Sequence, residues 1–213
     1  MPAISIVNQS AWPGRILIVS FFVSGACALI YQLCWLRFLN AAIGVDLDSS
    51  TIVVSAFMLG IGIGGFFGGR LADLWPKARI ACYATAELLL AAYGFSSLEL
   101  FAWAAQPGHL LGVAHHGLNA AGGFLMLLFP TALMGATLPL LTLSLNRTLR
   151  NIGGSVGILY ASNTLGAATA VLLTTFVFFD YLGLRSMTQI AAIGNVFVAL
   201  TALALHQQER KAT

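Results

Sequence analysis

Six long apolar stretches constrain what this chain of 213 residues can fold into more than any motif does. A helix needs about 20 apolar residues to cross the roughly 30 Å hydrocarbon core of a bilayer. The stretches are continuous rather than alternating, and a helix satisfies its own backbone hydrogen bonds in lipid. With 8% charged residues, the chain also lacks the charge that covers a soluble domain. The sequence predicts an all-α integral membrane protein, a single domain over residues 1–213, with transmembrane helices at about 16–36, 52–74, 79–103, 118–146, 153–179 and 185–206.

Basic residues predict the orientation of these helices. Six crossings place both termini on one side, and eight of the ten Lys and Arg residues lie in segments on that side. The eight are Arg15, Arg70, Lys77, Arg79, Arg147, Arg150, Arg210 and Lys211, whereas Arg37 and Arg185 lie on the other side. Cytoplasmic loops of membrane proteins carry the excess of basic residues. We therefore expect a multi-pass protein of a bacterial-type inner (plasma) membrane with both termini cytoplasmic, and no nucleic-acid partner.

Glycines at every fourth position mark one face of the second predicted helix. Gly60, Gly64 and Gly68 share this face, and Gly65 and Gly69 repeat the spacing beside it. Small residues let two helix backbones approach closely in lipid, where hydrophobicity does not drive helices together. The pattern predicts close packing within the bundle, with a homodimer face as the alternative.

The end of this helix resembles a known loop. GGRLADLWPKAR (residues 68–79) resembles the loop between the second and third helices of major facilitator transporters. The resemblance implies a cytoplasmic gating loop with Arg70, Asp73 and Arg79. Arg70 and Asp73 are spaced to pair on one helical face. The dipeptide Trp75-Pro76 departs from the fuller signature.

A narrower family resembles most of the chain. In the spermidine synthase-like proteins, a facilitator-like membrane domain is fused to a polyamine synthase domain. Five segments of this chain resemble that membrane domain: SGACALIYQLCWLR (24–37), AFMLGIGIGGFFGGRLAD (56–73), YATAELLLAAYG (83–94), FPTALMGATLPLL (129–141) and LYASNTLGAATAVLL (159–173). This resemblance implies a bundle like one half of a major facilitator fold, in which three helices and three more form an inverted repeat. A weak internal similarity between AFMLGIGIG (56–64) and SNTLGAATA (162–170) agrees with such a repeat.

The chain also departs from this family. It stops at Thr213 without the glycine-rich, acid-ended loop that would hold an aminopropyl donor. It shows no nucleophile–base pair either. From this we expect no cofactor and no enzyme activity in this chain.

Polar side chains at membrane depth are costly, so they mark candidate binding positions. The candidates for a solute or ion site are Glu87, Asn163, Asn195, Gln32 and Tyr31. Pro130 is expected to break the fourth helix near the same depth and to free a backbone carbonyl. Every Lys and Arg lies at a helix end, so Glu87 has no cationic partner at its depth. It would take up a proton or hold a cation from outside; alternatively, a neutral Glu87 joins helices by hydrogen bonds to Asn163, Asn195 or the freed carbonyl.

The outer side offers weaker candidates. Arg37 is expected to anchor the outer end of the first helix, where Asp46 and Asp48 could meet it; an outer gate is the alternative. The histidines of the loop between the third and fourth helices, at 109, 115 and 116, lack neighbouring carboxylates or cysteines, so we predict no metal site.

Two functions remain open at this point. The first is a half-sized facilitator-like carrier of a small solute, which could be a cationic, polyamine-like molecule. Such a carrier would act as a homodimer or together with another membrane chain. The second is a non-transporting membrane partner or anchor for a separately encoded spermidine synthase-like enzyme. A neighbouring enzyme gene would favour the second, and solute-dependent flux would establish the first.

Overall fold

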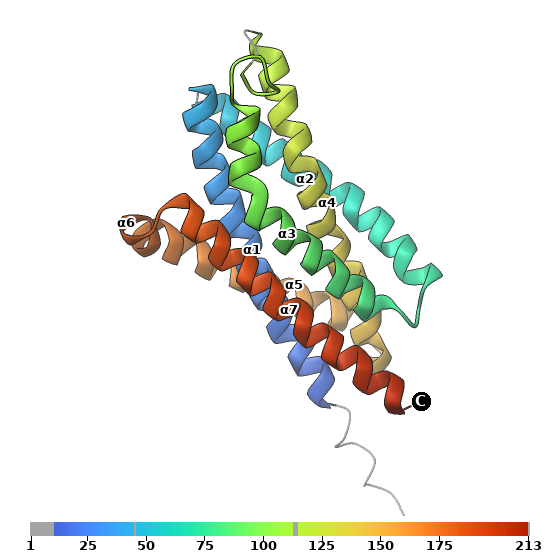
Figure 1. Ribbon diagram of the computed structural model, residues 1–213. Coiled ribbons are helices and arrows are strands. Elements are labelled where there is room, and N and C mark those ends of the chain that lie inside the picture. The colour runs from blue at the N-terminus through green and yellow to red at the C-terminus, as the bar shows by residue number, and fades with distance from the viewer. Residues whose placement is uncertain (1–10, 45, 113–114, 213) are drawn as a thin grey trace, which may run out of the picture.

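The computed structural model describes residues 11–44, 46–112 and 115–212, and these residues form helices and connections without any strand. The long helices are α1 (Ala11–Ile43), α2 (Asp46–Leu74), α3 (Arg79–Ala104), α4 (His116–Leu149), α5 (Ile152–Leu173) and α7 (Leu184–Ala212) (Figure 1). A π-helical turn, η1 (Thr174–Phe178), and the short α6 (Phe179–Tyr181) continue α5. The predicted all-helical class and the six long helices are confirmed within the described part of the chain.

Five of these helical segments are long and apolar enough to cross a membrane: Pro13–Ile43, Leu47–Leu74, Gly117–Leu149, Ile152–Tyr181 and Leu184–Gln208. The remaining long helix, α3, carries Glu87 and Glu99. Large apolar side chains also cover the outside of the bundle; Met58 and Phe176 are each 73% exposed. An apolar surface of this kind indicates contact with a membrane or a partner. The helices and their surface are those of a membrane protein.

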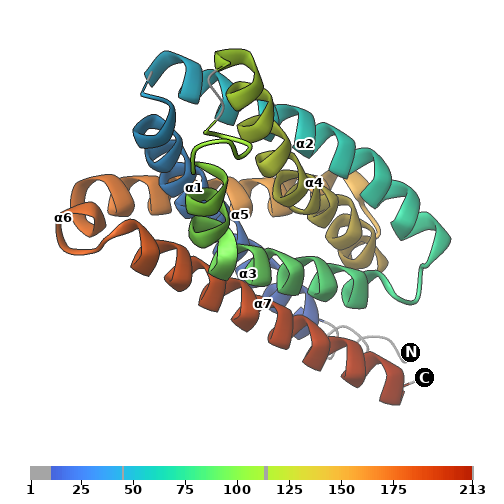
Figure 2. The ribbon, with the colours of Figure 1, turned by 45° about the horizontal axis from the view of Figure 1, so that its top comes forward.

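The helices pack in a regular order. α1 lies against α5 and α7, α4 lies against α2 and α3, and α3 packs on α7. Figure 2 shows α3 and α7 running side by side. The first turn of α1 and the last turn of α7 lie at the same end of the bundle (Figure 1).

The glycine face of α2 packs against α4. A β-carbon added to Gly60, Gly64 or Gly68 would run into Thr131, Ala132 or Ala136 of α4, respectively. Gly65 and Gly69 have more room, with their nearest such contacts at 3.9 and 4.0 Å. Of the two expectations for this face, the structure shows close packing inside the bundle.

The two prolines of α4 do not interrupt it, so the expected break at Pro130 is wrong. α4 is one helix from His116 to Leu149, with Pro130 and Pro139 inside it. The freed carbonyl is nevertheless present, because a proline at 130 removes the N–H that would bond the carbonyl of Met126. The hydroxyl of Tyr93 on α3 donates to this carbonyl at 2.7 Å. A side chain from a neighbouring helix thus replaces the missing donor.

Candidate binding site

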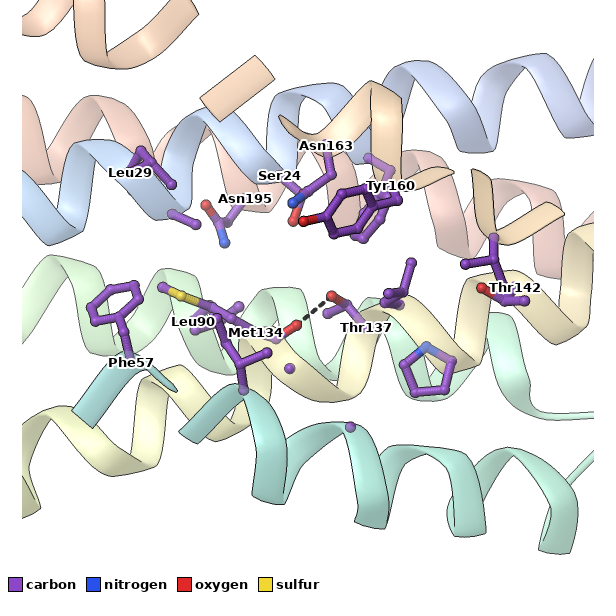
Figure 3. A pocket seen from close by; sticks show the side chains of 18 of the residues that line it. Ser24, Leu29, Phe57, Leu90, Met134, Thr137, Thr142, Tyr160, Asn163 and Asn195 are labelled. Atoms are coloured by element: carbon purple, nitrogen blue, oxygen red, sulfur yellow. Dashed lines mark hydrogen bonds between the residues drawn. The ribbon is translucent and has the colours of Figure 1, made fainter. Parts of the chain in front are cut away.

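A cavity of about 580 Å³ opens in the bundle among α1, α2, α4 and α5, with Leu90 of α3 and Asn195 of α7 also in its wall (Figure 3). Most of its lining is apolar. The polar side chains in the lining are Ser24, Gln32, Thr137, Thr142, Tyr160, Asn163 and Asn195. Thr137 donates to the backbone carbonyl of Met134 at 2.6 Å. The amide and hydroxyl groups of the other side chains are therefore the main polar features that a bound molecule would meet.

Glu87 lies directly behind this wall and is fully buried. Ser24 Oγ of α1 donates to Glu87 Oε1 at 2.6 Å, and Asn195 Nδ2 of α7 donates to Glu87 Oε2 at 2.9 Å. Both donors also line the cavity. Within the described part of the chain, no basic side chain forms an ion pair with Glu87. A carboxylate without a cationic partner is thus held one side chain away from the cavity.

Four of the five predicted site residues gather here. Asn163 and Gln32 line the cavity together with Asn195, and Glu87 bonds to Asn195. The remaining candidate, Tyr31, does not reach the cavity. Its ring stacks on Trp35 at a centroid distance of 5.1 Å, and the side chain is completely buried. Tyr31 belongs to an aromatic core cluster because the helix turns it away from Gln32.

Sequence reasoning missed two groups of this site. Ser24 was missed because an apolar helix often contains a lone serine, and nothing in the pattern marks its neighbour as Glu87. The second is Gly135, which lines the cavity and whose backbone carbonyl lies beside Gly65. Pro139 cannot supply the N–H that this carbonyl would accept in a regular helix. The signal was available, since a proline inside a helix always leaves the carbonyl four residues earlier without its donor.

The loop candidates between α2 and α3 contact an aromatic ring and backbone carbonyls rather than forming the expected ion pair. Arg70 lies over the ring of Phe66, 4.6 Å from its centroid, and does not pair with Asp73, which is exposed. Arg79 donates through Nε to the carbonyl of Ala72 at 2.7 Å and through Nη1 to that of Leu143 at 3.1 Å.

A second arginine also bonds to a backbone carbonyl at this end of the bundle. Arg147 of α4 donates to the carbonyl of Pro76 in the turn between α2 and α3. Arg79 and Arg147 together fasten that turn to the end of α4. The side chains of Arg210 and Lys211, which we counted on the same side, lie outside the described residues.

The outer candidate Arg37 contacts an aromatic ring. Its guanidinium carbon lies 3.4 Å from the centroid of Phe179 in α6, a cation–π contact. Asp46, one of the carboxylates expected to meet it, has its side chain outside the described residues. Arg185 pairs with Glu99 at 2.5 Å, with both side chains largely exposed. Arg37 thus joins α1 to the segment that follows η1, in keeping with a role as an anchor.

Two curated proteins are similar to this chain. It is 32% identical over 180 residues to polyamine aminopropyltransferase 2 of Streptomyces coelicolor. It is 26% identical over 193 residues to the polyamine aminopropyltransferase of Corynebacterium efficiens. The alignments cover 80% and 87% of this chain but 30% and 34% of the relatives, so the chain spans about a third of their length. No family model matches the chain, and no solved structure matches it.

These relatives support the link to spermidine synthase-like proteins and correct one expectation. Both are named as enzymes, which contradicts our expectation that the chain is not an enzyme. That expectation rested on the lack of a donor-binding loop in these 213 residues. The reasoning fails because the similarity reaches only about a third of each relative, and a loop missing from that third says nothing about activity.

Proposed function

We propose that this chain is the membrane-embedded part of a protein that transfers aminopropyl groups to polyamines, and that its bundle carries a small amine as a half-sized facilitator. One observation carries the proposal: the region similar to polyamine aminopropyltransferases is a membrane bundle that contains a cavity beside a buried carboxylate. The relatives' name supplies the chemical class of the solute. The cavity supplies a place for it inside the membrane.

The packing of the helices supports an inverted repeat of three helices and three more. If α1, α2 and α3 correspond to α4, α5 and α7, the pairs α1·α5 and α1·α7 correspond to α4·α2 and α4·α3, which also pack together. The closest contacts follow the same rule. Gly64 of α2 lies against the carbonyl of Ala132 in α4, and Gly166 of α5 lies against the carbonyl of Phe22 in α1.

A second pair of contacts keeps the same register. Gly135 of α4 lies against the backbone of Ile61 in α2, and Gly25 of α1 lies against the backbone of Asn163 in α5. In this register Gly64, rather than Gly60, corresponds to Gly166. The alignment of residues 56–64 with residues 162–170 by sequence is therefore displaced from it by about one helical turn. Inverted repeats are a common construction of transporters, with the solute site between the repeats.

A second copy of the chain would complete the carrier. Ile61 of α2 and Tyr160 of α5 line the cavity, yet they are 52% and 62% exposed in the single chain. A homodimer or another membrane chain covering this side would enclose the cavity. We place both termini on the cytoplasmic side of an inner membrane, since basic residues favour that side.

A membrane anchor for the aminopropyl-transferring part is the second candidate function. The observation that favours it is that Ser24 and Asn195 already satisfy both oxygens of Glu87. Under this alternative, these bonds hold α1, α3 and α7 together and the cavity carries no solute.

Flux measurements separate the two functions. We expect proteoliposomes containing the chain to take up radiolabelled putrescine or spermidine faster than protein-free liposomes do. The second measurement is the rate of aminopropyl transfer in membranes of the host cell, compared between cells with and without the chain. If membrane-bound transfer depends on the chain while amine uptake equals that of empty liposomes, the carrier proposal is wrong and the anchor remains.

A further inference from the structure

We propose that the cavity wall formed by Ser24 and Asn195, with Glu87 directly behind it, binds the protonated amino group of a linear amine lying in the cavity. This inference rests on the proposed function and names the site that recognises the solute. Its first support is charge. In a medium of low dielectric constant, a carboxylate interacts strongly with any cation that reaches it.

The residues around Glu87 supply no such cation. Cys27, Tyr31 and Tyr83 lie close enough to interact electrostatically with Glu87. None of these three side chains carries a positive charge in any protonation state. Ser24 and Asn195 donate hydrogen bonds but bring no net charge. An ionised Glu87 must therefore draw its positive charge from outside the described chain, through the wall that Ser24 and Asn195 share with the cavity.

The second support is an excess of hydrogen-bond acceptors. Asn195 turns its Nδ2 toward Glu87, and its Oδ1 is buried without a hydrogen-bond partner. The Gly135 carbonyl lacks the helical donor that Pro139 cannot provide, and Gly135 lines the same cavity. Buried acceptors without donors are unfavourable. An ammonium group offers three donors and no acceptor, so it complements these groups.

The third support is the apolar remainder of the cavity. Leu29, Phe57 and Leu90 line it in the part of the cavity where Asn195 lies (Figure 3). Such side chains accommodate the methylene groups between the nitrogen atoms of a linear amine. The described residues offer no group of three or more His, Cys, Asp or Glu side chains that could hold a metal ion here instead.

The test is amine binding to the purified full chain in detergent, measured by isothermal titration calorimetry with putrescine. 1,4-Butanediol is the uncharged probe of the same chain length. We expect Glu87→Gln to weaken putrescine binding by about tenfold or more, since it removes the negative charge behind the wall that attracts the ammonium group. The matched control is Glu99→Gln, which removes a carboxylate from the exposed end of the same helix. It should bind within about twofold of the unmodified chain.

Two further measurements keep the inference testable if Glu87→Gln does not fold. The unmodified chain should bind putrescine at least about tenfold more tightly than butanediol. Ile61→Trp, which fills the cavity from α2 and leaves Glu87 intact, should also weaken binding. Equal affinity for putrescine in the Glu87→Gln variant, or equal affinity for putrescine and butanediol, overturns the inference but leaves an amine carrier in place. No binding of any amine to the unmodified chain overturns both.

Discussion

Tyr93 shows how one side chain lets a proline remain inside a membrane helix. Its hydroxyl donates to the Met126 carbonyl that Pro130 leaves without a partner, while its ring packs edge-on against Trp35 at 5.7 Å. Tyr93→Phe would keep the packing and bury this carbonyl without a donor, so we expect it to destabilise the protein by about 1–3 kcal/mol. The measurement is thermal unfolding in detergent. Tyr160→Phe is the matched control, because Tyr160 is 62% exposed and should lose little. Equal unfolding temperatures for the two variants would contradict this role of Tyr93.

The contact between α2 and α4 depends on glycine at specific positions of one helix. A side chain at Gly64 would enter the space of the Ala132 carbonyl, whereas Gly62 on the same helix has open space around it. We expect Gly64→Leu to separate the two helices and to lower the unfolding temperature markedly. Inserting a larger side chain into a well-packed contact destabilises the folded state by about 1–3 kcal/mol or more. Gly62→Leu should remain close to the unmodified chain in the same thermal unfolding assay. Similar losses in both variants would show that the helix tolerates leucine poorly everywhere and that its close contact with α4 is unimportant.

The orientation of the whole bundle follows from its ends. Arg79 and Arg147 fasten the turn between α2 and α3 to α4, at the end of the bundle where α1 begins and α7 finishes (Figure 1). Basic residues gather at this end, and it should therefore face the cytoplasm. A reporter fused after Thr213 and one inserted in the turn between α2 and α3 should both report the cytoplasm. A reporter placed in the loop between α3 and α4 should report the outside. If the reporter after Thr213 reads external, the predicted topology is wrong.

Part of the candidate site was open to prediction from single residues. Glu87, Asn163 and Asn195 stand out because polar groups are costly at membrane depth. Their gathering at one cavity depended on helix rotation, which also turned Tyr31 into the aromatic core and away from the site. Arg70 was expected to pair with Asp73 from spacing alone, but it lies over the ring of Phe66, one turn earlier in the helix.

Hydropathy alone was enough to predict the class and the number of long helices, because bilayer thickness and backbone hydrogen bonding leave few alternatives. It did not predict their lengths equally well, since α1 was expected over residues 16–36 and runs from Ala11 to Ile43. The sequence also marked the face of α2 that must meet another backbone. The choice of neighbouring helices is visible only in the folded bundle. The folded bundle joins Glu87 to Ser24 and Asn195, which are 63 and 108 residues away in the chain. Hydropathy cannot predict such partners, because in lipid every helix is surrounded by apolar groups whichever helix lies next to it. The neighbour of a helix depends instead on close packing and on pairing the few buried polar groups.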